Sequence, residues 1–331
     1  MSIKTNSLRF KITFIFIALS LLAGTVMGAV IYVVTSRSIT AEVYHQLEAA
    51  ADSRGNHIAE HLENDLVTIS ALSKNGRLNE ELLKDEPSME LLQQIVEEEI
   101  KNYPNFIEMI ILDKGGNIAV SGDRAKIGLD RSSDEVFTGA LSGKVYFKDI
   151  YKSQVGGRAE YAVSAPILSR SGKVLGVIAG IGDASKLNEI VKDDTGMGKT
   201  GEIYLVNKDM VAITPTRLQG DKILFQKVQN DGIRESLSGR DVMGIFNDYR
   251  GKKVLAHYNI NEHLSAVIGV NWCVAAEMDM AEAYEPIYRL RNIFLLLFVF
   301  YLIAVGFAGV LVANNVARPI EALSGASAKI A

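Results

Sequence analysis

The sequence predicts an α+β protein in which a long N-terminal helix leads into two tandem antiparallel-sheet modules, with a transmembrane helix at each end. Two uncharged apolar runs, residues 12–34 and 292–316, are each long enough to cross a bilayer. Between them, an apolar repeat of helical period changes after Phe106 into short apolar segments that are separated by turns.

The composition is that of an ordered chain with more than one folded unit, because 48% of its 331 residues are hydrophobic and its net charge is only −4. Acidic and basic residues are nearly balanced and no Lys/Arg run stands out, which argues against nucleic acid as a partner. Cys273 is the only cysteine, so an intrachain disulfide and a cysteine-based metal cage are excluded. We expect Cys273 to be a small core residue in a strand.

The first apolar run, residues 12–34, predicts a membrane-spanning helix rather than a cleaved signal peptide, whose apolar core has roughly 7–15 residues. Residues 1–11 precede it and contain Lys4, Arg9 and Lys11. Basic residues are retained on the cytoplasmic side, so we expect residues 1–11 to be a cytoplasmic N-terminus.

The second run, residues 292–316, predicts the helix that returns the chain to the cytoplasm. Arg289 and Arg291 precede it, and their charge opposes this orientation. We infer the orientation from the first run, because the first transmembrane helix usually dominates the orientation of a membrane protein. The expected location is therefore the inner (plasma) membrane, crossed more than once, with residues from about 35 to 291 in the periplasmic or extracellular space.

After the first span, residues 35–80 are predicted to form a stalk helix, because apolar residues recur in steps of three, four or seven. Asn75-Gly76 ends the pattern, and a second helix is expected from Pro87-Ser88 to about Ile100. The stripe predicts either a homodimer contact or packing against the chain's own sheets. It consists of Ile39, Val43, Leu47, Ala51, Ile58, Leu62, Leu66, Ile69 and Leu72.

The strands are predicted from short apolar segments bounded by turn residues. The first module, residues 81–190, contains FIEMIILD and IAVS as a hairpin, followed by EYAVSAPIL and VLGVIAGIG. The second module, residues 191–288, contains EIYLV and MVAIT as a hairpin, followed by KKVLAHYNI, AVIGV and WCVAAEM.

The two modules show signs of an internal duplication. The string ALSG at residues 140–143 corresponds to SLSG at residues 236–239, and Asp183 corresponds to Asp279 at the same offset of 96. Each module is large enough to enclose a small core of its own.

Several strings then resemble a double Cache (dCache) sensor of chemoreceptors and sensor histidine kinases, over about residues 35–290. The first module contributes DR…FTGALSG from Asp130, SAPI from Ser164 and GKVLGV from Gly172. The second contributes GKTGEIYLVN from Gly198, ITPTR from Ile213, YRG from Tyr249 and WCVAAE from Trp272. Residues 318–323 (RPIEAL) resemble the opening of a HAMP linker, so residues 317–331 are expected to be its truncated start.

The resemblance implies two PAS-like Cache modules, with a small ligand bound in the first, membrane-distal module and a displacement passed on by the second, membrane-proximal one. It also implies a homodimer that relays the signal through the second span and the HAMP segment. The output, a methyl-accepting chemotaxis domain or a histidine kinase, would lie beyond the end of this sequence. We therefore expect no enzyme activity and no cofactor within the chain itself.

Amino-acid-sensing members of this family carry an Arg and a Trp-Tyr pair before a helix alanine, and an Asp at the end of the last strand. With Ala140 placed on that alanine, Asp134 stands at the Arg, Val136 at the Trp and Phe137 at the Tyr. Asp183 alone matches, so the expected ligand is left open among an amino acid, an amine and an organic acid.

Candidate ligand-binding residues are charged and aromatic side chains of the first module, because small organic ligands favour aromatic walls with a few polar groups. They are Arg131, Asp134, Phe137, Tyr146, Tyr151, Tyr161 and Asp183. Each has a structural alternative: Phe137 and Tyr161 as core residues, Asp134 as a solvated helix residue, and Asp183 as the cap of a helix starting at Ala184.

Other patterns give no positive signal. Gly198-Lys199-Thr200 lacks the first glycine of a phosphate loop, since that position is Asp193, and it precedes a strand. His57 and His61 are spaced to share a metal but are expected to be on a solvated helix face, so no metal site is predicted. Two rival functions remain: an adaptor that binds a partner protein, and a membrane-tethered enzyme.

Overall fold

The computed structural model describes residues 8–84, 86–153, 157–193, 195–219, 223–224 and 226–312. It divides into two compact units: residues 1–43 with 281–331, and residues 44–280. The predicted HAMP start at residues 317–331, the first seven residues and the end of the second apolar run lie outside the described residues.

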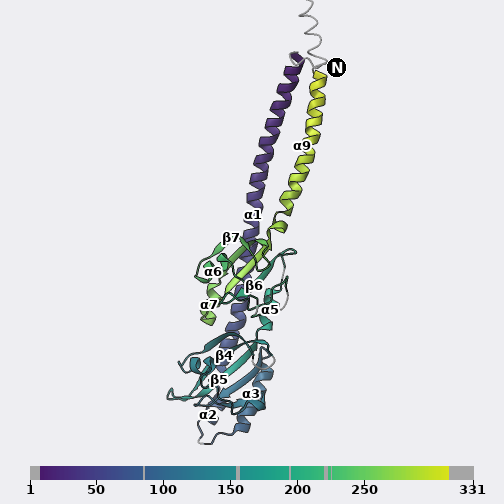
Figure 1. Cartoon of the computed structure of the whole chain (residues 1–331). Helices are drawn as coiled ribbons and strands as arrows, with labels where there is room; N and C mark the ends of the chain where they lie inside the picture. The colour runs from purple at the N-terminus through teal and green to yellow at the C-terminus, as the bar shows by residue number, and fades with distance from the viewer. Residues whose placement is uncertain are drawn as a thin grey trace, which may run out of the picture. The chain divides into compact units, whose positions relative to one another are not determined.

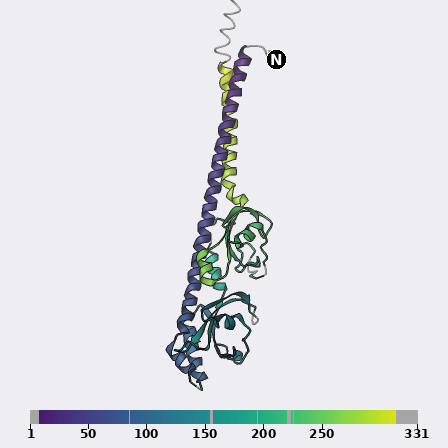
Figure 2. The same ribbon diagram turned by 90° about the vertical axis from the view of Figure 1, so that its left-hand side faces the viewer.

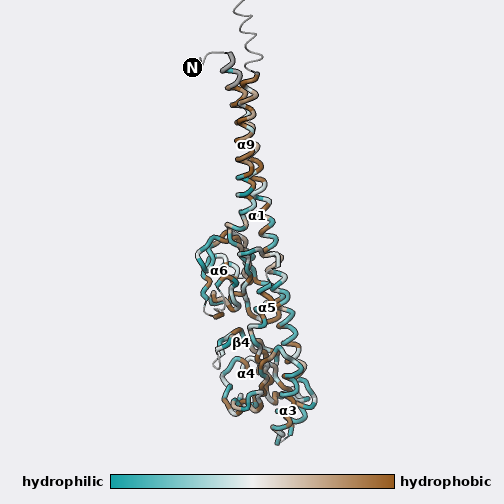
Figure 3. The backbone as a smooth tube through the Cα atoms, turned by 90° about the vertical axis from the view of Figure 1, so that its right-hand side faces the viewer, coloured by the Kyte–Doolittle hydropathy of each residue, from teal (hydrophilic) through white to brown (hydrophobic). Residues whose placement is uncertain are grey.

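The first unit contains two apolar helices, the N-terminal part of α1 (Leu8–Leu72) and α9 (Glu285–Val312). Both are long and apolar enough to cross a membrane. Figure 3 shows apolar residues concentrated along these two segments. Large side chains such as Leu22 (63%) and Leu296 (69%) are exposed, which is a surface suited to lipid rather than to water.

The two apolar helices run side by side (Figure 1). They contact each other through small residues on α1 and aromatic rings on α9. A Cβ atom added to Gly24 would lie 2.3 Å from the Phe298 ring, and one added to Gly28 would lie 2.2 Å from the Phe294 ring. Phe294 and Phe298 stack on each other with centroids 5.8 Å apart. Glycines four residues apart therefore let the helices approach closely, as in small-xxx-small packing.

In the second unit, α1 continues through the predicted stalk to Leu72, and its apolar stripe packs inward. Leu47, Ala51, Ile58, Leu62 and Ile69 are fully buried. The stripe thus covers the chain's own sheets and is not in itself a sign of a dimer.

Two shorter helices follow the stalk. Asn75 caps α2 (Gly76–Leu82), and Ser88 caps α3 (Met89–Asn102) by accepting the backbone N–H of Leu91. The predicted break at Asn75-Gly76 and the predicted helix after Ser88 are both confirmed.

The first module is a five-stranded antiparallel sheet in the order β2-β1-β5-β4-β3. Figure 2 shows α1 running along the side of both sheet modules. Its strands are β1 (Phe106–Leu112), β2 (Ile118–Ser121), β3 (Tyr146–Lys152), β4 (Ala159–Leu168) and β5 (Val174–Asp183). One face packs on α1 and α3. The other face packs on α4 (Glu135–Ala140), and the short helices η1 (Arg124–Lys126) and α5 (Ser185–Val191) complete the module.

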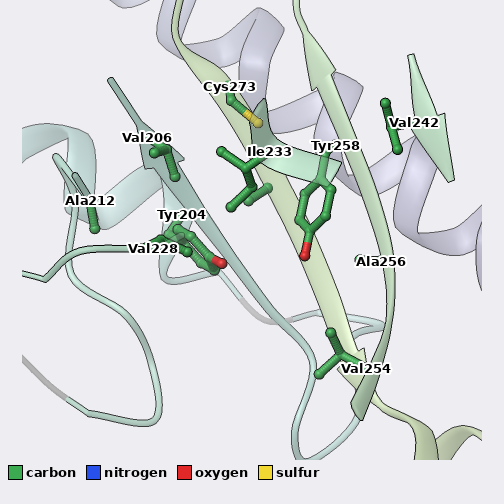
Figure 4. Close-up of a cluster of buried hydrophobic side chains, with 11 residues drawn as sticks. Tyr204, Val206, Ala212, Val228, Ile233, Val242, Val254, Ala256, Tyr258 and Cys273 are labelled. Atoms are coloured by element: carbon green, nitrogen blue, oxygen red, sulfur yellow. The ribbon is translucent and has the colours of Figure 1, made fainter. Parts of the chain in front are cut away.

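The second module is a four-stranded antiparallel sheet in the order β6-β9-β8-β7. Its strands are β6 (Glu202–Val206), β7 (Val242–Asn247), β8 (Lys253–Ile260) and β9 (Cys273–Asp279). The helices α6 (Asp231–Leu237), α7 (Glu262–Ile268) and α8 (Met280–Ala283) accompany it. Figure 4 shows its core, in which Ile233 of α6 packs among Tyr204, Tyr258 and Cys273.

The structure bears out the internal duplication. Helices α4 and α6 begin 96 residues apart and are capped by Asp134 and Asn230, which are also 96 apart. Strands β5 and β9 end at Asp183 and Asp279. Both modules thus repeat one pattern of strands, with the helix before β3 corresponding to the helix before β7.

Two of the strand predictions were wrong. The first three residues of AVIGV belong to α7, because Asn261 caps the helix start and Gly269 ends it in the left-handed conformation, at φ 71°. MVAIT forms only isolated bridges, Val206 with Ala212 and Val211 with Lys227, instead of a full hairpin strand.

Candidate functional site

A cavity of about 420 Å³ lies in the first module, between the sheet face that carries α4 and the segment from η1 to α4. It is lined by Glu108, Ile118, Lys126, Leu129, Asp130, Arg131, Asp134, Lys148, Tyr151, Lys152, Ser153, Glu160 and Ile181. A second hollow of about 550 Å³ adjoins it and shares Glu108, Lys126, Ser153 and Glu160. The size suits a small organic molecule.

Strand register decides which side chains reach the cavity. Successive side chains of a strand point to opposite faces. On β4, Glu160 lines the cavity while Tyr161 points to the other face, and Glu160 lies directly opposite Asp183 on β5. On β1, Glu108 reaches the cavity next to an irregularity in the pairing with β5.

Asp134 is an anchored side chain. Its Oδ1 accepts the backbone N–H of Val136 at 3.0 Å and the Lys148 ammonium at 2.7 Å, and Arg131 Nη1 lies 3.2 Å from its Oδ2. Burial acts to raise the pKa of Asp134, but the bonds from Lys148 and Val136 outweigh it and hold the pKa below its usual value. Asp134 therefore caps α4 and orients two cations at the cavity, in place of the solvated helix position considered above.

The other carboxylates of the cavity have different partners. Lys126 forms an ion pair with Glu108, which also accepts the Ser121 hydroxyl at 2.6 Å. Glu160 is paired with Tyr151 across β4 and β3, and burial together with the charge of Glu160 raises the pKa of the Tyr151 hydroxyl. The Lys148 ammonium lies 4.6 Å from the centre of the Tyr151 ring, a cation–π contact.

Three of the seven predicted residues, Arg131, Asp134 and Tyr151, line this cavity. Phe137 is packed in the core beneath α4. Tyr146 lies against Gly139, and its hydroxyl is 3.4 Å from Glu135 Oε2.

Tyr161 and Asp183 also have structural roles. Tyr161 is fully buried on the α1 side, where its hydroxyl donates to Asp65 at 2.5 Å, and burial raises its pKa. Asp183 accepts the backbone N–H of Ser185 at 2.8 Å, at the start of α5. Sequence reasoning missed Glu160, for which a charged residue inside the apolar strand segment EYAVSAPIL was the available signal.

Strand β3 joins the cavity to the second module. Its residues Lys148 and Tyr151 line the cavity, while Asp149 Oδ1 accepts the indole N–H of Trp272 at 2.9 Å. The Phe147 and Trp272 rings meet edge to face at 5.8 Å. Since Trp272 directly precedes β9, a shift of β3 bears on the central strand of the second sheet.

Three buried acids converge in the second module. Glu202, Asp248 and Glu277 each place one carboxylate oxygen within 4.8 Å of the others, in a spacing that could hold a metal ion. Burial raises the pKa of Glu277 to about 8, and the charges of Glu202 and Asp248 act in the same direction. On the stalk, by contrast, His57 is exposed, and His61 lies 3.9 Å from Asp65.

Residues 35–287 match the family model dCache_1, described as a Cache domain. The match takes in well over half of the chain, and the protein belongs to this family. No curated protein sequence matches the chain.

Solved ligand-binding domains of chemoreceptors share the fold. One is Tlp3 of Campylobacter jejuni in complex with 4-methylisoleucine, at 12% identity and a TM-score of 0.57, covering 76% of this chain and 95% of that one. Another is CtaA of Pseudomonas fluorescens in complex with L-leucine, at 17% identity and a TM-score of 0.53, covering 75% and 98%. A third is PctC of Pseudomonas aeruginosa PAO1 in complex with GABA, at 18% identity and a TM-score of 0.52, covering 72% and 99%.

Proposed function

We propose that the protein is a transmembrane signal receptor that binds a small ligand in the cavity of its first module. Family membership and the two apolar helices support a sensor anchored in the inner (plasma) membrane, with residues 35–291 in the periplasmic or extracellular space. The signal leaves through α9 and a HAMP linker to a cytoplasmic output, a chemotaxis methyl-accepting domain or a histidine kinase.

The ligand that the cavity fits best is a small zwitterion of the amino-acid type. The observation that carries this choice is the presence of both charge signs on one cavity wall. Glu160, which lines the cavity beside Tyr151, would accept an ammonium group. The Nη1 atom of Arg131 is paired with Asp134, and the Arg131 side chain is 40% exposed. The remaining N–H donors of its guanidinium can therefore bind a carboxylate.

Two of the solved domains with this fold are complexes with amino acids, 4-methylisoleucine and L-leucine, and one is a complex with GABA. All three ligands carry an ammonium and a carboxylate. These likenesses support the ligand class, while the residues that bind the ligand in this chain are argued from its own cavity.

Relay follows from the position of β3. A ligand shifts a conformational balance only by binding one state more tightly than the other. A ligand that draws Arg131 and Glu160 together would favour one placement of β3, and Asp149 would transmit that placement to Trp272. The second module then biases α9.

A homodimer is part of the proposal, although the buried stalk stripe no longer supports it. The opposite side of α1 exposes Val67 at 60%. A Val67→Cys variant is expected to form disulfide-linked dimers when membranes are oxidised, whereas Leu47→Cys, at a fully buried position, is not. Monomers at Val67 and at its exposed neighbours on α1 would remove the dimer from the proposal.

The direct test is a thermal-shift screen of the full chain in detergent against the L-amino acids, GABA and simple amines. A ligand at 100 times its Kd should stabilise the protein by about 2.7 kcal/mol. Glu160→Gln and Arg131→Gln should weaken binding at least tenfold, because each leaves a ligand charge unpaired. Arg170→Gln, on an exposed turn of the same module, is the matched control.

Absence of any stabilising compound, together with specific capture of a partner protein, would favour the adaptor function instead. Turnover of a compound by the purified chain that disappears in Glu160→Gln would favour a membrane-tethered enzyme. A shift that is retained in both cavity variants would place the ligand elsewhere.

A further inference from the structure

The second module contains a buried group of carboxylates that ligand sensing in the first module does not use. Glu202 opens β6, Asp248 follows β7 and Glu277 lies on β9, with exposures of 2%, 6% and 1%. One oxygen from each lies within 4.8 Å of the other two. Three separate segments of the chain thus bring their acids to one buried point.

The partners of these acids divide into charged and neutral donors. Asp248 is bound by the Arg250 guanidinium at 2.5 Å, and Arg250 also reaches Asp279 at 2.5 Å. Glu202 is bonded by the Tyr249 hydroxyl at 2.7 Å and by the backbone N–H of Arg217 at 3.0 Å.

Glu277 is bonded by hydroxyl groups. Its Oε1 accepts the Tyr204 hydroxyl at 2.8 Å and the Tyr258 hydroxyl at 2.5 Å. Figure 4 shows these two tyrosines on β6 and β8, the strands that flank β9. Removing a charged carboxylate from water costs several kcal/mol. Neutral hydroxyl donors do not offset the negative charge of such a carboxylate.

The second oxygen of Glu277 points to a ligand independently of the clustering. Glu277 Oε2 is buried and has no hydrogen-bond partner among the residues that the structure describes. A proton on Oε2 would leave a buried donor with no acceptor in the same described part of the chain, so protonation alone does not complete the site. A cation satisfies the oxygen and offsets the charge at once.

The donor set indicates which cation. Carboxylate oxygens are ligands for hard divalent ions. Mg²⁺ usually keeps several waters and is bound through one or two carboxylates, whereas Ca²⁺ accepts about six to eight oxygens in a flexible geometry. A buried site with three carboxylates from three segments therefore favours Ca²⁺.

We propose that Glu202, Asp248 and Glu277 form a structural Ca²⁺ site inside the second module. The ion would link β6, the turn after β7 and β9, and so fix the sheet through which the second module acts on α9. This inference does not depend on which ligand binds the first module.

The test uses the full chain in detergent after exhaustive treatment with a chelator. Addition of CaCl₂ at 100 times the Kd is expected to raise the thermal midpoint by roughly 5 to 10 °C, and equilibrium dialysis with radioactive Ca²⁺ is expected to give one ion per chain. KCl at matched ionic strength should give no such shift.

Glu277→Gln keeps the shape of the side chain and removes its charge. The variant is expected to fold in chelator and to lose at least tenfold in Ca²⁺ affinity. Glu202→Gln provides the same test if Glu277→Gln does not accumulate. Glu262→Gln, an exposed acid on α7, is the matched control and should bind Ca²⁺ as the wild type does.

The proposal is overturned if the wild type binds no Ca²⁺ by dialysis, if KCl reproduces the shift, or if both Gln variants retain wild-type affinity. Failure of ligand binding in the first module would leave these readouts unchanged, so the two proposals fail separately.

Discussion

The indole N–H of Trp272 donates to Asp149 Oδ1 at 2.9 Å and ties the second module to the strand that lines the cavity of the first. Trp272 is 1% exposed and is the only tryptophan in the chain. Burial has the largest effect on the Asp149 carboxyl and raises its pKa, although the hydrogen bonds from the Ile150 backbone and the Trp272 indole act to lower it.

Asp149→Asn is expected to flatten the pH dependence of stability. Because the folded pKa of Asp149 lies above the unfolded value, the native state holds the proton longer, and the free energy of unfolding falls as pH rises through this window. Asparagine removes this loss and can still accept the Trp272 N–H.

Urea unfolding of wild type and variant between pH 4 and 7 measures the effect. The free energy of unfolding of Asp149→Asn should increase relative to that of the wild type as pH rises. Asp149→Ala, which also loses the hydrogen bond to Trp272, should be destabilised by about 1–3 kcal/mol. Parallel pH profiles for the wild type and Asp149→Asn would contradict the assignment.

Cys273 is expected to resist alkylation in the folded protein. Burial raises the pKa of its thiol to about 12, and the thiolate is the reactive species. Mass spectrometry after iodoacetamide treatment at pH 8 should show no adduct in the native chain and complete modification in urea. A Val67→Cys variant gives the positive control, since that position is 60% exposed. Rapid native modification of Cys273 would contradict its burial.

The same Val67→Cys variant tests the topology. Because native Cys273 is fully buried, Val67→Cys provides the one accessible thiol. A membrane-impermeant maleimide added to intact spheroplasts is expected to label the variant. Labelling that appears only after lysis would place the sheet modules in the cytoplasm and overturn the proposed orientation.

Contact between the two apolar helices depends on the absence of side chains at Gly24 and Gly28. Gly28→Leu is expected to separate them, because a Cβ atom there would lie 2.2 Å from the Phe294 ring. Spin labels at Val26 and Leu296, both exposed, report the interhelix distance by electron resonance. Gly306→Leu is the control, since no atom lies within 4 Å of its added Cβ. An unchanged distance in Gly28→Leu would contradict the packing.

The sequence was sufficient to predict the long helices α1, α3 and α9 and most strands, because spacing, caps and turn residues are local signals. The strands β3 and β7 were not predicted, and α7 was predicted as a strand. The repeat offset of 96 correctly related α4 to α6 and β5 to β9. AVIGV was assigned to a strand because a short apolar run does not distinguish strand from helix. The N-cap of α7, Asn261, lies five residues before the run, and Gly269 inside the run ends the helix.

The candidate site was only partly predictable. Arg131 and Asp134 were predicted correctly because they precede a recognisable helix. On β4, however, Tyr161 was predicted to line the cavity, whereas its neighbour Glu160 does so. Neighbouring residues of a strand face opposite sides, and pairing register, which is a tertiary property, decides which of them faces the cavity. The acids of the second module come from separate segments, so their convergence has no local signal.

The most direct test of the account is the fluorescence of Trp272 during ligand addition to the full chain. If the cavity of the first module binds the ligand and β3 passes the change on, the emission of this single tryptophan changes saturably, with the same midpoint as the thermal shift. The change should persist in Arg170→Gln and weaken in Glu160→Gln. A ligand that stabilises the protein through the cavity residues and leaves Trp272 emission and lifetime unchanged would contradict the proposed relay.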